Sequence, residues 1–463
     1  MLFSSLEFLY LFLPFSLLLY FLCPLRWRNA VLLAVSLVFY GSGEPIYLFL
    51  MILTVAADYG FGLWIERGVR RGGKTKGALI LAVGFNLSLL ALFKYYDLFA
   101  TAFSLPTLGL SLPIGISFYT FQALSYVIDV YRREVRAQRD PIAFGTYVAL
   151  FPQLIAGPIV RYSEIDEQLC HRRHSLTRAA EGVSIFCVGL AKKVLLANAA
   201  GEMAQSALRG AGERTTLGIW LWLVLYAFQI YFDFSGYSDM AVGLGRIFGF
   251  EFPENFRYPY TARSITDFWR RWHITLSSWF REYVYIPLGG NRQGRWRTYR
   301  NLLITWALTG IWHGAAWNFL VWGLYFFLLL ALEKSFFGKV LSRVPRVVGH
   351  LYALFFILVG WLIFASDGSM AIGGASLFGG LFGIGTEHIF DARSLYELLR
   401  ALPIFCVMAL GATPLPKRVY TALVRRAPRI GAAVCTLLCL SSLLLCTAYL
   451  VDSGYNPFLY FRF

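Results

Sequence analysis

Charged side chains are scarce in this sequence of 463 residues. Asp, Glu, Lys and Arg together make up only 15% of the chain, whereas they make up about 25% of soluble domains. Hydrophobic residues account for 58%, and the mean hydropathy is +0.59. So little charge excludes an ordinary soluble domain and predicts a protein that crosses a membrane several times.

Acidic side chains are scarcer than basic ones, 26 against 42, so the formal net charge is +16. The basic residues form short clusters between apolar runs rather than one continuous patch. This pattern is typical of the cytoplasmic loops of membrane proteins. It argues against a nucleic-acid partner, which would need a basic footprint on one soluble domain. The clusters begin at Arg26, Arg67, Arg132, Arg161, Lys334 and Lys417.

The chain also lacks the common catalytic and metal-binding motifs. It contains no GxSxG elbow, no HExxH helix and no P-loop. Its 7 cysteines form no paired CxxC motifs, which argues against a zinc site and a disulfide framework. Cys170, His171 and His174 have metal-ligand spacing, but the neighbouring Arg172 and Arg173 favour a solvated loop. We therefore expect no metal and no permanently bound cofactor.

The apolar runs predict an all-α polytopic membrane protein with about eleven or twelve transmembrane helices, plus re-entrant and interfacial helices. Because Arg26 and Arg28 follow the first run, we expect the N-terminus outside, and the count of spans places the C-terminus there too. No eukaryotic targeting signal is visible, which favours a bacterial inner membrane with periplasmic termini. The predicted spans are residues 8–23, 29–42, 46–65, 77–94, 113–130, 179–199, 217–232, 315–333, 347–366, 394–413 and 430–450.

Two segments interrupt this pattern of spans. Residues 151–158 contain Pro152 and Pro158 and are predicted to be re-entrant, because irregular backbone at membrane depth must be satisfied by protein or by a water-filled cavity. Residues 233–250 carry too many Asp, Ser and Gly residues for a lipid-facing helix. We therefore expect a buried or re-entrant segment there, separate from the span at 217–232, with its glycines serving close helix packing.

The most charged stretch runs from Ser264 to Arg300. Its periodicity predicts one helix over residues 267–285 with an aromatic face and a polar face. The aromatic face comprises Trp269, Trp272, Leu276, Trp279 and Tyr283, and the polar face comprises Arg270, His273, Ser277 and Arg281. Such a helix suits the cytoplasmic interface, and its polar face would suit a phosphate-bearing ligand such as coenzyme A. An interfacial helix without any chemistry is the alternative interpretation.

His313 follows an apolar segment, residues 301–312, that is too short to span a membrane alone. An ionisable residue at a break between helices inside the membrane often lines a cavity. Histidine is also the usual general base near neutral pH. A hydrogen-bonded core histidine is the alternative interpretation of His313.

Two runs in this region, FWRRWHITLSSWFREYVYIPLGGNR and GIWHGAAWNFLVWG, resemble the membrane-bound O-acyltransferase family, and most closely its bacterial alginate O-acetylation branch. Residues 112–132, 150–162 and 232–243 support the resemblance, which covers most of the chain. The related D-alanine exporters of Gram-positive walls share a similar WHITLS-like helix and the WHG motif.

The resemblance implies a ring of helices around a central funnel, with His313 at its throat as the general base and His273 at the second family position on the donor side. It implies acetyl-CoA as the cytoplasmic acyl donor and a periplasmic SGNH-type acetyltransferase as a partner. Candidate donor-binding or supporting residues are Arg270, Ser277, Arg281, Asp233, Ser238 and Asp239.

We expect one integral-membrane domain over residues 1–463. Its catalytic core would cover about 112–335, with peripheral helices in 1–111 and 347–450 and a periplasmic tail over 451–463.

The tail ends in aromatic residues around Tyr460. The Tyr460 hydroxyl is a candidate acyl relay, and an aromatic belt at the outer interface is the alternative.

The function that the family resemblance implies is transfer of acetyl groups from cytoplasmic acetyl-CoA across the membrane, for O-acetylation of an exported polysaccharide such as alginate. Transfer of D-alanyl or acetyl groups to teichoic acid or peptidoglycan is an alternative. A transporter or flippase for a glycan precursor is another. Transporters often contain inverted repeats, and the absence of a second WHITLS–WHG pair in the sequence argues against that class.

Overall fold

The computed structural model describes residues 1–73, 75–155, 157–208, 214–366, 374–452 and 458–459, which fold mainly into helices. Within these residues the only β-type pairing is an isolated bridge between Thr215 and His388. The predicted all-α class is therefore confirmed for the described part of the chain.

Eight helices in the described ranges are long and apolar enough to cross a membrane, which confirms a multi-pass membrane protein. They are Tyr47–Arg70, Lys76–Ala102, Leu176–Leu208, Thr216–Ile247, Trp317–Leu341, Arg346–Ala365, Ala392–Gly411 and Pro428–Asp452. The predicted number is higher because it includes shorter helices. Examples are α2 (Arg28–Gly43) and α6 (Ile116–Arg132), which have 16 and 17 residues.

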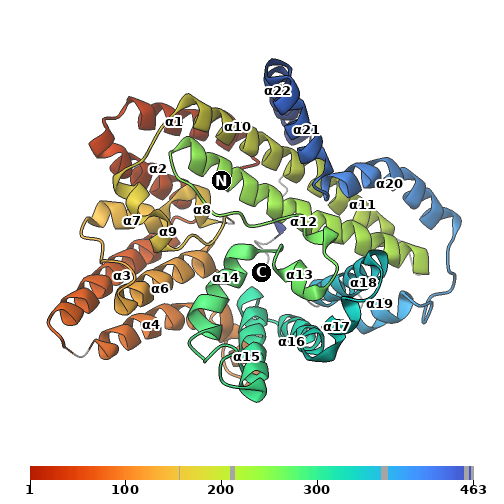
Figure 1. Ribbon diagram of the computed structural model, residues 1–463, viewed down its shortest axis with the longest axis horizontal. Coiled ribbons are helices and arrows are strands. Elements are labelled where there is room, and N and C mark those ends of the chain that lie inside the picture. Colours follow the sequence, from red (N-terminus) through yellow and green to blue (C-terminus); the bar gives the residue numbers. More distant parts are fainter. Residues whose placement is uncertain (74, 156, 209–213, 367–373, 453–457, 460–463) are drawn as a thin grey trace. The chain divides into compact units, whose positions relative to one another are not determined.

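The chain divides into two compact units. Unit 1 comprises Met1–Gly189, Tyr237–Pro253 and Leu450–Phe461, and unit 2 comprises Leu190–Gly236, Glu254–Tyr449 and Arg462–Phe463. The further helices of unit 1 are α1 (Leu13–Leu22), α3 (Tyr47–Arg70), α4 (Lys76–Leu90), α5 (Tyr96–Ala102), α7 (Pro141–Ala149), α8 (Phe151–Leu154), α9 (Tyr162–Cys170) and most of α10 (Leu176–Ala191). Figure 1 labels most helices of both units.

The segment predicted to be re-entrant, residues 151–158, begins with the one-turn helix α8 (Phe151–Leu154) and lies between α7 and α9 in unit 1. Its free backbone groups find side-chain partners inside the protein. The Phe151 amide donates to the Ser36 hydroxyl at 3.1 Å, and the Tyr147 hydroxyl donates to the Val160 carbonyl at 3.1 Å. This satisfaction by protein groups is what irregular backbone inside a membrane requires.

The predicted break before residue 233 is wrong, because α12 (Thr216–Ile247) is one continuous helix of 32 residues. The prediction that residues 233–250 are buried is confirmed, since most of their side chains are buried. Within unit 1, a Cβ atom on Gly243 would lie 2.6 Å from the carbonyl oxygen of Gly182 on α10. The glycine there allows close helix packing, and it does not break the helix.

Unit 2 contains both candidate histidines, His273 and His313. Its further helices are α11 (Asn198–Leu208), α13 (Ile265–Trp269), α14 (Ile274–Phe280), α15 (Arg295–His313), α16 (Trp317–Leu332), α17 (Gly338–Leu341), α18 (Arg346–Ala365), α19 (Gly374–Gly380), α20 (Ala392–Gly411), α21 (Leu415–Arg426) and most of α22 (Pro428–Asp452). Helix α15 packs along α16, which in turn packs on α18, and Figure 1 shows the three as neighbours.

Candidate active site

His313 is the last residue of α15, as the sequence predicts. The helix stops there because the next residue, Gly314, is extended, with φ −177°. A Cβ atom on Gly314 would lie 2.2 Å from the ring of Phe319, so a larger residue does not fit without a shift. The helix is longer than the predicted apolar segment, since α15 begins at the basic residue Arg295 and has 19 residues.

Aromatic rings surround the His313 imidazole, which is only 4% exposed. The ring centroid of Trp322, on α16, lies 4.9 Å from that of His313, and the centroid of Phe364, on α18, lies 5.4 Å away. Both rings meet the imidazole edge-to-face, at 83° and 81°. This geometry fixes the imidazole plane and keeps bulk water away from it.

Two glycines set the spacing of the helices that hold this site. A Cβ atom on Gly310 of α15 would lie 2.4 Å from the carbonyl oxygen of Phe319. A Cβ atom on Gly323 of α16 would lie 2.4 Å from the carbonyl oxygen of Trp306 and 3.1 Å from the Cα of Gly310. The backbones of α15 and α16 therefore touch one turn before His313, an arrangement that small residues permit.

His273 does not lie within a continuous helix, and that prediction is wrong. Helix α13 ends at Trp269, and α14 begins at Ile274. Between them His273 adopts a left-handed conformation, with φ 44° and ψ 55°. The turn moves the imidazole off the polar face and into the protein, where it is 1% exposed.

The buried His273 ring makes one hydrogen bond to a described residue. Its Nδ1 lies 3.0 Å from Oδ1 of Asn255, whereas its Nε2 is buried without a hydrogen-bond partner among the described residues. Phe234 of α12 packs edge-to-face on the ring at 4.6 Å. Burial lowers the pKa of His273 to about 3, so the imidazole is neutral at physiological pH.

The two candidate histidines belong to one cluster in unit 2. The Trp312 indole lies 5.0 Å from the His313 ring and 6.2 Å from the His273 ring, measured between centroids. The structure thus brings together the residues that the sequence places 40 positions apart. Two buried imidazoles at helix ends, enclosed by aromatic rings, provide proton acceptors in a dry environment.

A buried ion pair lies one residue from this cluster. Lys193, in the π-helical segment between α10 and α11, places Nζ 2.7 Å from Oδ1 of Asp233 on α12. Both side chains are 3% exposed. The sequence pattern pointed to Asp233 but not to Lys193, because the surrounding residues 179–199 are apolar enough to be read as an ordinary membrane span. The available signal was the rarity of an ionised side chain at membrane depth.

The other candidate residues lie elsewhere. Arg270 and Arg281 are exposed, and Arg281 lies 3.6 Å from its neighbour Glu282. Ser277 is half-buried, and its amide donates to the His273 carbonyl. Ser238 is buried and Asp239 is half-buried, both on the part of α12 that belongs to unit 1.

The C-terminal tail is described only at Phe458 and Leu459, so Tyr460 lies outside the described residues. Phe458 is fully buried in unit 1. Its ring centroid lies 4.6 Å from that of Tyr237 on α12, and Tyr237 stacks on Phe3 at 5.3 Å. The segment next to Tyr460 therefore enters the protein core, which an aromatic belt at a lipid interface would not require.

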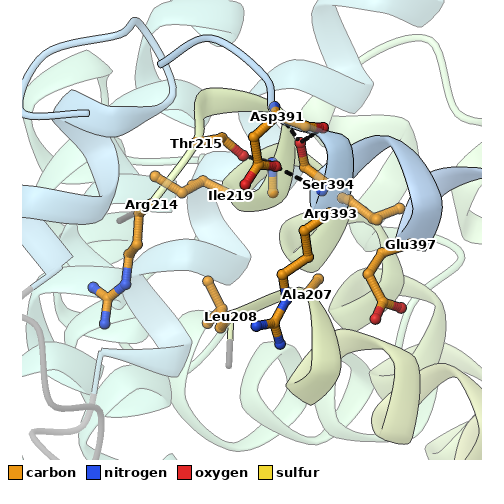
Figure 2. Close-up of a pocket in the computed structure, with 11 residues that line it drawn as sticks. Ala207, Leu208, Arg214, Thr215, Ile219, Asp391, Arg393, Ser394 and Glu397 are labelled. Atoms are coloured by element: carbon orange, nitrogen blue, oxygen red, sulfur yellow. Dashed lines mark hydrogen bonds between the residues drawn. The ribbon is translucent and has the colours of Figure 1, made fainter. Parts of the chain in front are cut away.

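A small cavity in unit 2 is unsuited to acyl transfer. It has a volume of about 30 Å³, room for roughly one water molecule, and lies where α20 begins. Figure 2 shows Asp391 and Ser394 hydrogen-bonded to each other at that helix start, where the Asp391 carboxylate accepts from the Ser394 amide at 2.7 Å. No group of three His, Cys, Asp or Glu side chains in the described ranges has the geometry to hold a metal ion.

These features define a class of protein, a polytopic membrane enzyme with buried histidines at helix breaks. The family model described as the membrane-bound O-acyltransferase family, MBOAT, matches residues 85–371. The chain therefore belongs to this family and is an acyltransferase. The match includes both candidate histidines and the Lys193–Asp233 pair.

The chain is also similar to individual proteins of known name. The probable alginate O-acetylase AlgI of Azotobacter vinelandii is 43% identical over 79% of this chain and 75% of the relative. The probable alginate O-acetylase AlgI of Pseudomonas putida is 37% identical over 100% of both chains. The peptidoglycan O-acetyltransferase of Helicobacter pylori is 36% identical over 79% of this chain and 77% of the relative.

Proposed function

We propose that this protein transfers acetyl groups from cytoplasmic acetyl-CoA across a bacterial inner membrane for the O-acetylation of an exported polysaccharide such as alginate. The observation that carries the proposal is His313, buried at the end of α15 inside a family of membrane acyltransferases. The similarity to alginate O-acetylases over most or all of the chain supports the acetyl group and the polysaccharide acceptor.

In the proposed reaction His313 acts as the general base. Its imidazole takes the proton from the acceptor hydroxyl, and the hydroxyl oxygen forms a bond to the thioester carbonyl carbon. The carbon–sulfur bond then breaks, and the proton held by His313 passes to the departing thiolate of coenzyme A. The aromatic enclosure by Trp322 and Phe364 supports this role, because a dry site protects the thioester from hydrolysis.

The direction of transfer requires donor and acceptor on opposite sides of the membrane. The basic clusters that follow the apolar runs support a cytoplasmic face near Arg26 and Lys417, with periplasmic termini. An SGNH-type acetyltransferase in the periplasm is the proposed partner that completes transfer to the polymer.

Peptidoglycan O-acetylation is the second candidate function. The similarity to the peptidoglycan O-acetyltransferase of Helicobacter pylori favours it specifically. The two functions share the acetyl donor and the base and differ in the final acceptor.

The first test expresses the chain in an alginate-producing host that lacks its own membrane acetylase, and measures ester-linked acetyl groups on the secreted polymer. We expect acetylation with the wild-type chain and with His171→Gln, which alters an exposed loop histidine. We expect none with His313→Gln. Acetylated peptidoglycan with unmodified alginate would transfer the assignment to the second candidate.

Tyr460 is proposed as the acyl relay between the two sides of the membrane. The burial of Phe458 supports the idea that the tail enters the protein. Tyr460→Phe removes one oxygen atom and should abolish polymer acetylation while leaving expression and thermal stability unchanged. Normal polymer acetylation in Tyr460→Phe would exclude the relay without affecting the role of His313.

A further inference from the structure

Asn255 is the polar residue that holds the His273 ring. It precedes α13 in the chain and is 2% exposed. Its Oδ1 atom is the acceptor for donors from the first turn of α14 and from His273, which immediately precedes that helix. The Thr275 hydroxyl donates to it at 3.0 Å and the Thr275 backbone amide at 3.3 Å, and His273 Nδ1 lies 3.0 Å away.

These contacts fix which way the Asn255 amide points. A backbone N–H is always a donor, so the group that faces the Thr275 amide must be the carbonyl oxygen of the side chain. Turning the amide by 180° would place its NH₂ group against the Thr275 N–H and against the His273 ring. The orientation of Asn255 therefore follows from hydrogen-bond complementarity.

The orientation of Asn255 determines the tautomer of His273. Because Oδ1 can only accept, His273 Nδ1 must carry the proton and donate it. Since the ring is neutral, Nε2 then carries a lone pair and no hydrogen. Nε2 is buried and has no hydrogen-bond partner among the described residues. Buried acceptors in folded proteins are normally hydrogen-bonded, so the Nε2 lone pair is available to an O–H or N–H donor.

The backbone keeps the imidazole in place in spite of its unfavourable conformation. The Asn255 carbonyl accepts from the Ile274 amide at 3.0 Å, and the Arg257 amide donates to the Arg271 carbonyl at 2.9 Å. These two backbone hydrogen bonds lie on either side of His273, whose φ of 44° is disfavoured for a non-glycine residue. Such strain persists where the surroundings enforce it, and it is concentrated at functional sites.

We propose that Asn255 is a positioning residue for acyl transfer: it locks His273 in the Nδ1–H tautomer, so that Nε2 accepts a hydrogen bond from an O–H or N–H group of the bound substrates. The inference rests on the proposed function in one respect, namely that His273 lies at the acyl-transfer site. Asn255 itself touches His273 and Thr275 and acts on the reaction through the imidazole.

Titratable groups near the ring are few. The described rings packed on His273 are Phe234, Phe256 and Trp312, none of which titrates. On neighbouring elements, Asp233 is paired with Lys193, and His313 follows Trp312. A new charge at position 255 would therefore be the closest to the imidazole.

The test compares three variants of the full chain in acetyl-CoA turnover and polymer acetylation. Asn255→Leu removes the acceptor, frees the tautomer and should lower kcat about tenfold or more, with little change in KM for acetyl-CoA. Asn255→Asp keeps an acceptor for both Nδ1 and the Thr275 amide but adds a negative charge. That charge stabilises the imidazolium, so the acid limb of the pH–rate profile should move to higher pH. The control variant His171→Gln, at an exposed residue away from this cluster, should retain wild-type kcat.

An unchanged kcat in Asn255→Leu, or an unshifted acid limb in Asn255→Asp, would overturn the inference. If Asn255→Leu fails to fold, as judged by size-exclusion chromatography, the pH profile of Asn255→Asp decides alone. Failure of the positioning role can be distinguished from failure of the proposed function. Loss of activity in His313→Gln alongside normal Asn255 variants would reject the positioning role only, whereas an inactive wild-type chain would reject the function itself.

Discussion

The Lys193–Asp233 ion pair provides the sharpest test of how unit 2 is held together. The two side chains meet at 2.7 Å and are each 3% exposed. Asp233→Leu would leave an ammonium group buried without its counter-ion, and removing one partner of a buried pair costs about 3–5 kcal/mol. The same loss is expected for Lys193→Met, which leaves the carboxylate.

The double variant Lys193→Met/Asp233→Leu removes both charges at once. Replacing a buried ion pair by apolar side chains is often neutral or stabilising, so the double variant should recover most of the lost stability. The assay is thermal unfolding of the four proteins in the same detergent, followed by tryptophan fluorescence, with a double-mutant cycle to extract the coupling. Single variants as stable as the wild type, or a double variant less stable than either single variant, would contradict charge compensation between Lys193 and Asp233.

Acetyl transfer by the double variant then tells whether the charges matter beyond stability. Phe234, next to Asp233, packs on the His273 ring at 4.6 Å. If the pair only supports the fold, a stable double variant should acetylate polymer like the wild type. If the pair also sets the electrostatic field at the His273 imidazole, acetyl transfer should fall although the stability of the double variant is restored.

Three further predictions concern the spacing of α15 and α16, the pH dependence of stability and the C-terminal tail. Gly323→Ala should reduce acetyl transfer by about 100-fold, because its Cβ would push α16 away from α15 beside His313, whereas Gly60→Ala, with open space around its Cβ, should be silent in the same assay. Because His273 has a pKa near 3 when folded and about 6.5 when unfolded, the unfolded state binds more protons below pH 6.5 and stability falls as pH drops. Between pH 7 and pH 5 this loss should reach about 2 kcal/mol and should be absent in His273→Gln, so a melting temperature with equal pH dependence in both proteins would contradict the burial of His273. Phe458→Ala should release the C-terminal tail, seen as faster removal of a C-terminal tag by protease, with polymer acetylation reduced; an unchanged cleavage rate would mean that Phe458 does not hold the tail.

Much of the fold follows from the sequence because hydropathy and basic clusters reflect a simple physical constraint. Apolar runs such as 347–366 and 394–413 coincide with α18 and α20 to within two residues. The end of α15 at His313 was also predictable, since the apolar run 301–312 is followed by an ionisable residue and a glycine.

The errors arise where tertiary contacts override local pattern. The polar residues of α12 suggested a break, but in the folded chain Asp233 is matched by Lys193, so the helix continues. The periodicity around His273 is helical, and only the pairing of residues 255–257 with 271–274 forces the left-handed turn. Neither contact leaves a signal within a local window of sequence. The central funnel implied by the family resemblance stays a prediction.

The most direct test of the central claim is acetyl-CoA turnover by the purified wild-type protein and by His313→Gln, matched for amount and thermal stability. We expect release of coenzyme A that depends on the wild-type chain, survives in His171→Gln and falls to background in His313→Gln. Equal turnover in the wild type and in His313→Gln would contradict the assignment of His313 as the base for acyl transfer.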